Sequence, residues 1–315
     1  MAISRRSFVK QSLAIGAGAA AASLLGCSPA SGAQRKVKFP KAKRVIIFTF
    51  DGIRPDGLAQ AQTPNIDALI AGGSASYLTR DVMPSITMPN YTSHLCGAGP
   101  EVHGVVNNDW KLDNHSLPAV ETDEDGYFPS VFKVLHENGI KTAYYWNWGP
   151  LIYPINQKWL DDKLEAADEE YNVLCDRAME YISANRDSKM FVFLYNLHTD
   201  HIGHTYAWMS PEYIKSIEEG DEQVGRVVDF LKKEGLFEES HLMFISDHGG
   251  INYGHGGTTP EEMIVPWVIA GPGIKKGFII EEPNNTVNTA STVLKLFGLE
   301  QPLAWTGEVP NSIFE

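Results

Sequence analysis

Side chains that could bind metal ions recur in five short motifs between positions 50 and 257 of this sequence. The residues concerned are Asp51, Thr87, Asp200, His204, Asp247, His248 and His255. Carboxylates and imidazoles are ligands that divalent zinc, manganese or iron accept in proteins. Two such ions about 3.5–4 Å apart can hold both the attacking and the leaving oxygen of a phosphoryl transfer. The motifs therefore predict a hydrolase with two divalent metal ions, zinc being the first choice.

Each motif also has an interpretation that needs no metal. Asp51 precedes a glycine, and an Asp-Gly pair after a strand commonly forms a turn. His248 could end a strand and bond only to the backbone. His255 is harder to explain as packing, because the glycines around it allow close approach of the backbone. The motifs support one another, because a histidine present by chance would not be accompanied by the other four motifs.

The segment with Asp200 and His204 leaves two local structures open. A spacing of four residues would put both side chains on one face of a helix. Gly203 and the abrupt change to polar residues favour a loop instead, and we expect a loop. His198 and His201 are competing candidates in the same segment.

Alternating strands and helices must position these motifs. Apolar runs predict strands at 44–50, 141–146, 190–196, 241–246 and 264–270. Capping residues and periodicity predict helices at 63–70, 129–138, 169–186, 211–233 and 287–297. This alternation predicts an α/β fold, a three-layer sandwich with a mostly parallel central sheet flanked by helices. Asp51, Asp200 and Asp247 each follow a strand, and the carboxyl ends of parallel strands share one edge.

The first residues match an export signal. The pair Arg5-Arg6 stands before an apolar run, 13–25, that is too short and too rich in small residues to span a membrane well. Leu24-Leu25-Gly26-Cys27 resembles a lipobox, in which Cys27 would carry a lipid tether; cleavage after 31–33 is the alternative. We expect a signal peptide at 1–33, a linker at 34–42 and one catalytic domain at 43–315. Twin-arginine export would place the protein in the periplasm or cell envelope.

The chain is acidic. Its net charge is −13, and removing the three basic residues of the leader gives −16. Such a charge disfavours non-specific binding of nucleic acid, and bound cations would have to attract an anionic substrate. Besides Cys27, only Cys96 and Cys175 remain, and we expect two free, buried thiols. The expected assembly is a monomer or loose dimer.

At these motifs the chain resembles the alkaline phosphatase superfamily, and within it the nucleotide pyrophosphatase/phosphodiesterase branch. The resemblance extends from about Lys43 to Gly307. It rests on Asp-Gly-x-Arg-x-Asp at 51–56, Thr-Pro-Asn-Ile-Asp at 63–67, Thr-x-Pro-Asn at 87–90, Pro-x-x-His-Gly at 100–104, Asp-x-x-Gly-His at 200–204 and Asp-His-Gly at 247–249. It implies an alkaline phosphatase-like fold and a metal-dependent phosphoric ester hydrolase.

The resemblance also implies a role for each residue. One metal would be held by Asp200, His204 and His255, and the other by Asp51, Asp247 and His248, with Thr87 completing its shell. Thr87 would be the nucleophile and form a phosphothreonine intermediate. Asn108 would donate to a phosphate oxygen, with the adjacent Asn107 as a decoy. Tyr195 would flank the substrate, or be only the last core residue of its strand.

The substrate is expected to be a small phosphate ester, and a nucleotide is one candidate. Monoesterases of the superfamily use extra cations for a dianionic phosphate, and none occurs in the aromatic segment 144–153. A phosphodiester or pyrophosphate is therefore favoured, while Lys158 and Lys163 keep a phosphomonoesterase open. Met88 and Tyr91 depart from the nucleotide-specific pattern of the branch. A phosphonoacetate hydrolase-like enzyme and a non-catalytic surface lipoprotein remain alternatives; the Cys/Ser-x-Pro-x-Arg motif of sulfatases is absent.

Overall fold

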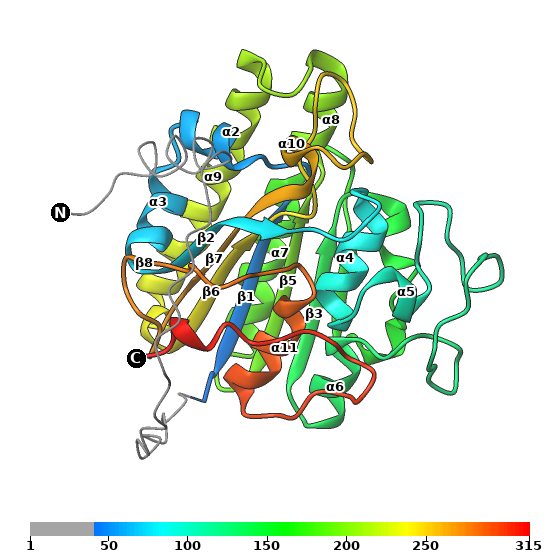
Figure 1. Cartoon of the computed structure of the whole chain (residues 1–315). Coiled ribbons are helices and arrows are strands. Elements are labelled where there is room, and N and C mark those ends of the chain that lie inside the picture. Colours follow the sequence, from blue (N-terminus) through cyan, green and yellow to red (C-terminus); the bar gives the residue numbers. More distant parts are fainter. Residues whose placement is uncertain (1–40) are drawn as a thin grey trace, which may run out of the picture.

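The computed structural model describes residues 41–315 (Figure 1). The expected signal peptide, Cys27 and most of the expected linker lie outside these residues. Within the described part, no helix combines the length and apolar character that crossing a membrane requires. Cys96 and Cys175 are free and buried, as expected.

An eight-stranded sheet forms the centre of the molecule, in the order β4-β3-β5-β1-β6-β7-β2-β8. The strands are β1 (Arg44–Phe50), β2 (Gly73–Arg80), β3 (Lys141–Trp146), β4 (Asp162–Glu165), β5 (Met190–Asn196), β6 (Ser240–Ile245), β7 (Ile264–Ala270) and β8 (Phe278–Ile279). β7 runs antiparallel to both its neighbours, β6 and β2, and the other pairings are parallel. The predicted α/β class with a mostly parallel sheet is confirmed.

Helices cover both faces of the sheet (Figure 1). One face carries α2 (Pro55–Gln60), α3 (Pro64–Ala71), α7 (Tyr171–Ala184) and α9 (Pro211–Lys233). The other face carries α4 (Thr87–Cys96), α5 (Pro100–His103), α6 (Val131–Glu137) and α11 (Asn288–Phe297). The remaining helices are α8 (His198–Tyr206), α10 (Pro260–Met263) and the short 3-10 helices Gly149–Ile152, Gln157–Trp159, Phe237–Glu239 and Asn311–Ile313.

The central strand β1 shows why both faces must be covered. Its alternate side chains point to opposite faces, so Val45 and Ile47 enter one core while Ile46 and Phe48 enter the other. All of these side chains are fully buried. Each contributes about 1.5–3 kcal/mol of hydrophobic free energy relative to an exposed position. A continuous apolar run is thus the sequence signature of a strand between two helical layers.

The strand β2 was not predicted, because Gly73–Arg80 contains small and hydroxylated residues in place of an apolar run. Ser74 and Ser76 are buried there. A Cβ on Gly73 would lie 2.1 Å from the backbone oxygen of Ile269 on β7, so only glycine permits this close pairing. The strand is defined by its antiparallel partner rather than by its own hydrophobicity.

Candidate active site

Three neighbouring strands deliver the candidate ligands to one edge of the sheet. β1 lies between β5 and β6 and runs parallel to both. Asp51 follows β1, α8 with Asp200 and His204 follows β5, and Asp247 and His248 follow β6. The Asp51 N–H donates to the Asn196 carbonyl at 2.9 Å, which extends the β1–β5 pairing up to the site. The convergence expected from strand order is present, and α8 and α10 lie at this end of the sheet (Figure 1).

The expected loop at 200–204 is wrong, because this segment is the helix α8, His198–Tyr206. The four-residue spacing accordingly puts Asp200 and His204 on one face of the helix. Gly203 does not break the helix. A Cβ at that position would approach the Trp208 ring to 2.7 Å, so the glycine makes room for the indole.

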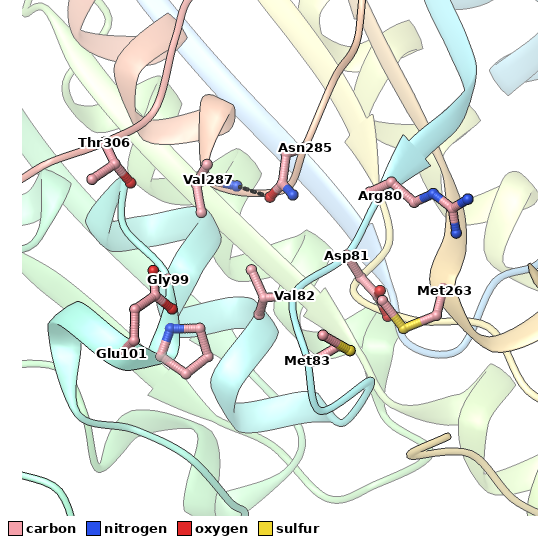
Figure 2. Close-up of a pocket in the computed structure, with 11 residues that line it drawn as sticks. Arg80, Asp81, Val82, Met83, Gly99, Glu101, Met263, Asn285, Val287 and Thr306 are labelled. Atoms are coloured by element: carbon pink, nitrogen blue, oxygen red, sulfur yellow. Dashed lines mark hydrogen bonds between the residues drawn. The ribbon is translucent and has the colours of Figure 1, made fainter. Parts of the chain in front are cut away.

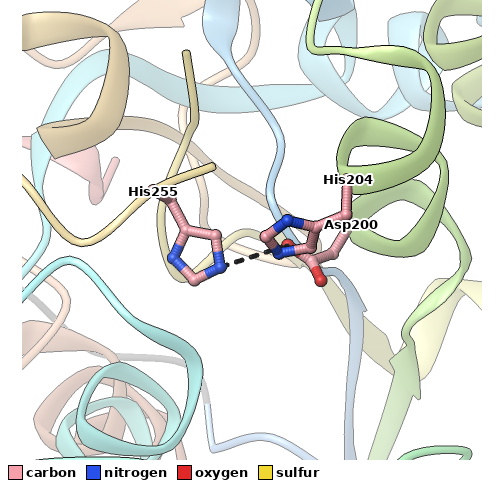
Figure 3. A group of neighbouring side chains, drawn as sticks. All are labelled: Asp200, His204 and His255. Carbon is pink, nitrogen blue, oxygen red and sulfur yellow. Dashed lines mark ion pairs between the residues drawn. The ribbon is translucent and has the colours of Figure 1, made fainter. Parts of the chain in front are cut away.

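The first cluster consists of Asp200, His204 and His255, which we call the outer group (Figure 3). The Nε2 atoms of both histidines lie 3.5 Å from Asp200 Oδ1. The outer group is partly open to solvent, since the His204 side chain is 44% exposed.

The second cluster consists of Asp51, Asp247 and His248, which we call the inner group. His248 Nε2 lies 3.2 Å from Asp51 Oδ1 and 3.2 Å from Asp247 Oδ2, and all three side chains are fully buried. Asp200 joins the two groups, because potential ligand atoms of Asp51, Asp200 and His248 all lie within 4.8 Å of one another. The His248 and His255 rings also stack, with centroids 3.7 Å apart.

Backbone carbonyls orient all three imidazoles in the same way. His248 Nδ1 lies 2.8 Å from the Gly249 oxygen, and His204 Nδ1 lies 2.8 Å from the Tyr253 oxygen. His255 Nδ1 lies 2.9 Å from the Ser85 oxygen. A neutral imidazole that donates from Nδ1 presents the lone pair of Nε2, which is how metal-binding histidines are usually held.

The inner group is electrostatically incomplete. Burial, together with the charges of Asp247 and Asp200, raises the pKa of Asp51 well above its usual value, and burial raises that of Asp247 to about 8. Burial lowers the pKa of His248 to about 3, so this imidazole is neutral. Asp51 Oδ1, Asp200 Oδ1 and Asp247 Oδ2 are buried without a hydrogen-bond partner.

Unpaired buried acceptors of this kind are costly, and divalent cations would satisfy them. The donor set is three carboxylates with three imidazoles whose Nε2 atoms face the carboxylates. It therefore fits divalent ions such as zinc, manganese or iron.

Thr87 lies beside the inner group as the first residue of α4. Its Oγ1 is 3.3 Å from His248 Nε2. Asn90 holds the segment that precedes it, since its Oδ1 accepts from the Val82 N–H at 2.7 Å and its Nδ2 donates to the Ile86 carbonyl at 3.1 Å. The sequence interpretation had given Asn90 no role, although the Thr-x-Pro-Asn motif contained it.

Asn108 lies close to Thr87 in space. Its Oδ1 accepts from the Met88 N–H at 2.8 Å, which fixes the amide plane next to the start of α4. With the oxygen engaged, the Nδ2 atom is the donor that remains for a ligand. The side chain of the neighbouring Asn107 bonds to its own loop, since its Oδ1 accepts from the Asp109 N–H.

Of the two roles that the sequence left open for Tyr195, its position fits the core residue, because its side chain has no exposed surface. Its hydroxyl donates to Asp51 Oδ2 at 2.5 Å, and its ring packs edge-on against Tyr91. As the second-last residue of β5, it is held beneath the site by the sheet. Tyr195 therefore orients a candidate ligand from below.

Lys158 and Lys163 were the two cations for which a phosphomonoesterase remained an alternative, and both bond to other residues. Lys158 pairs with Glu124 and Asp125 and lies over the Trp159 ring. Lys163 donates to Gln157 at 2.6 Å. In the aromatic segment, Tyr144 and Tyr145 are core residues, whereas Trp148 packs on the cluster that contains Met88. Both lysines are therefore held by residues outside the inner and outer groups.

A separate cavity of about 590 Å³ lies behind the segment that precedes Thr87 (Figure 2). Asp81 and Met263 are among the residues that line it. The Asp81 carboxylate is 3% exposed, and neither of its oxygens has a hydrogen-bond partner. Burial and the charge of Asp247 raise its pKa to about 9, so this group is protonated at neutral pH.

Comparisons with known proteins identify the family of this chain. A family model for type I phosphodiesterase / nucleotide pyrophosphatase matches residues 45–257, more than half of the chain. An uncharacterized pyrophosphatase/phosphodiesterase of Schizosaccharomyces pombe is 26% identical over 220 residues, which cover 65% of this chain and 44% of that protein. Human ectonucleotide pyrophosphatase/phosphodiesterase family member 1 is 28% identical over 218 residues, 65% of this chain and 23% of that protein. The chain thus spans less than half the length of these relatives.

A solved structure extends the likeness in fold. Murine ectonucleotide pyrophosphatase / phosphodiesterase 5, as an inactive variant in complex with AMP, superposes with a TM-score of 0.73 at 16% identity. The match covers 87% of this chain and 100% of that one. Together with the family model, it confirms the superfamily and branch expected from the motifs. The chain belongs to the type I phosphodiesterase/nucleotide pyrophosphatase family.

Proposed function

We propose that this chain is a two-metal hydrolase that cleaves phosphodiester or pyrophosphate bonds through Thr87. One observation carries the proposal: the Thr87 hydroxyl lies 3.3 Å from His248 Nε2, beside carboxylate oxygens that have no partner. The names of the curated relatives, pyrophosphatase/phosphodiesterase, support the reaction class. The mouse neighbour of known structure is an inactive variant in which one threonine is replaced by alanine, which supports a threonine nucleophile.

The proposed reaction has two steps. Thr87 Oγ attacks phosphorus, the bond from phosphorus to the leaving oxygen breaks, and a phosphothreonine forms on Thr87. Asn108 Nδ2 donates to a non-bridging oxygen of the phosphoryl group. Water then attacks the phosphothreonine, the bond between phosphorus and Thr87 Oγ breaks, the phosphoryl product leaves, and a proton from that water restores the Thr87 hydroxyl. The two divalent ions, held by the inner and outer groups, would supply charge stabilisation and lower the pKa of the bound hydroxyl and water.

The preference for diesters rests on charge. A phosphodiester carries one negative charge less than a monoester dianion, and it therefore needs fewer cationic donors. Lys158 is neutralised by two carboxylates, and Lys163 bonds to Gln157. The partly buried Trp148, which packs on the cluster that contains Met88, would offer an apolar surface to the rest of the ester. The inactive mouse neighbour binds AMP, a phosphomonoester with the form of a cleavage product, which supports a nucleotide group on one side of the scissile bond.

The test compares hydrolysis of bis-p-nitrophenyl phosphate, the p-nitrophenyl ester of thymidine 5′-monophosphate and p-nitrophenyl phosphate by metal-loaded protein. We expect faster turnover of the diesters, abolished in Thr87→Ala. Preference for the nucleotide ester would narrow the substrate to nucleotides. Faster monoester turnover would contradict the diester assignment. Turnover of phosphonoacetate alone would instead identify a phosphonoacetate hydrolase-like enzyme.

We also propose that residues 1–33 export the folded protein and that Cys27 anchors it if it is lipidated. The pair Arg5-Arg6 and the Leu24–Cys27 motif support this location. Replacing both arginines with lysine should keep the protein in the cytoplasm in a cell-fractionation experiment. Equal export of this variant would contradict the twin-arginine route.

A further inference from the structure

The indole of Trp208 lies among the segments that carry the candidate ligands. Trp208 is buried, and its Nε1–H donates to the Gly52 carbonyl at 2.8 Å, directly after Asp51. Its ring meets the His204 ring edge-on at 5.0 Å and the His255 ring at 5.8 Å. One side chain thus touches the β1 end of the inner group and both histidines of the outer group.

Three glycines make room for this ring. A Cβ would come within 3.2 Å of the indole at Gly52, within 2.7 Å at Gly203 and within 2.2 Å at Gly250. Each glycine belongs to a different ligand segment: Gly52 follows Asp51, Gly203 precedes His204, and Gly250 lies two residues after His248. The indole therefore occupies the space of three missing side chains and sets the distances between these segments.

The backbone around Trp208 is strained. Among residues 41–315, the non-glycine residues with positive φ are Ala207 at 78°, Met209 at 70° and Asn252 at 52°. The first two flank Trp208, and the Asn252 carbonyl accepts from the Trp208 N–H at 2.7 Å. Such angles are unfavourable for residues with a Cβ and persist where the surrounding structure imposes them. The strain is confined to the segment that holds the indole in place.

We infer that Trp208 is a positioning residue for the metal site, acting mainly on His204 and His255 of the outer group. The inference rests on the proposed function. The edge-on contacts fix both imidazole rings, and the bond to Gly52 fixes them relative to Asp51. A Trp208 that served only as core filling would not need contacts to four separate ligand segments.

Co²⁺ titration of the apoprotein tests this inference, because it reports ligand geometry without turnover. In Trp208→Phe we expect one of the two Co²⁺ ions to bind about 10–100-fold more weakly, with a changed visible absorption spectrum. Trp305→Phe is the matched control. Trp305 is also buried, donates to the Pro129 carbonyl at 3.1 Å and packs against Gly97, and none of these contacts is with a ligand segment. This control should bind both ions as the wild type does.

Gly203→Ala is a second variant that guards against a folding defect. Alanine favours helix over glycine, so α8 should remain folded, yet the new methyl group would press on the indole. We expect weakened binding of one ion here too. Wild-type affinity for both ions in Trp208→Phe and Gly203→Ala would overturn the inference, as would equal weakening in Trp305→Phe. A wild-type protein that binds no metal would overturn the proposed function itself, and the inference with it.

Discussion

The inner and outer groups face the same space but are built differently. Asp51, Asp247 and His248 follow central strands, and their side chains are fully buried. In the outer group, Asp200 and His204 come from a helix and His255 from a glycine-rich loop, and His204 is 44% exposed. A sheet fixes the positions of residues at its strand ends, whereas a short helix and a loop need extra contacts such as those of Trp208. The inner group is therefore the buried half of the site, held by strand ends, and the outer group is the half held by a helix and a loop.

The largest effect is expected when one histidine of each group is replaced by alanine and the two variants are compared. His248→Ala removes a buried ligand next to Thr87, so kcat/KM should fall at least about 1,000-fold and stability by roughly 2 kcal/mol. His204→Ala removes an exposed ligand. It should weaken metal binding about 10–100-fold and change stability by less than about 0.5 kcal/mol. Kinetics at saturating metal and urea unfolding of both apoproteins measure the difference; equal losses in both variants would remove the distinction between the groups.

A second prediction concerns Asn108, which lies beside the inner group. Asn108→Ala removes the Nδ2 donor, and kcat should fall about 100-fold with little change in KM, because this contact strengthens as charge develops. Asn107→Ala is the matched control, since its side chain bonds to Asp109 and should leave kcat unchanged. If both variants kept wild-type kcat, Asn108 would have no catalytic contact.

A third prediction concerns Asp81, behind the inner group. Its pKa is raised from 3.8 to about 9 in the folded protein, so folding retains a proton that the unfolded chain releases. The stability from this group is complete below the unfolded pKa and is lost as pH rises toward about 9. Its contribution to the slope is up to ~1.4 kcal/mol per pH unit. Asp81→Asn should remove this slope in urea unfolding between pH 5 and 8; identical slopes in mutant and wild type would show that Asp81 is charged when folded.

The smallest expected effect comes from Tyr195. Tyr195→Phe deletes the bond to Asp51 Oδ2 but keeps the buried ring, so metal affinity should fall roughly tenfold, and KM should not change. Metal titration alongside steady-state kinetics separates these quantities. A raised KM with unchanged metal affinity would restore the original expectation that Tyr195 contacts the substrate.

Sequence reasoning succeeded where one local signal decides the structure. The apolar runs predicted β1, β3, β5 and β7 to the residue, and the Pro and Lys ends of α9 predicted that helix. The convergence of Asp51, Asp200 and Asp247 on one edge of the sheet was predictable for the same reason, whereas the division into two groups came from the resemblance. The resemblance supplied the pairing of Thr87 with this group, which spacing alone does not give.

The misses share a tertiary cause. Gly203 suggested a loop, yet it lies inside α8. This position is a glycine because a larger residue would collide with the indole of Trp208. β2 is a strand because β7 accepts a close glycine partner, and its own residues give no strand pattern. The role of Tyr195 stayed open between substrate contact and core packing, because its neighbours in the sequence do not reveal that its hydroxyl points to Asp51. Contacts between distant segments decide all three.

Anomalous X-ray scattering from crystals of the zinc-loaded protein tests the central claim most directly. Two zinc peaks are expected, one bound by Asp51, Asp247 and His248 beside Thr87, and the other bound by Asp200, His204 and His255. A single peak shared around Asp200, or no peak among these residues, would contradict the two-metal account.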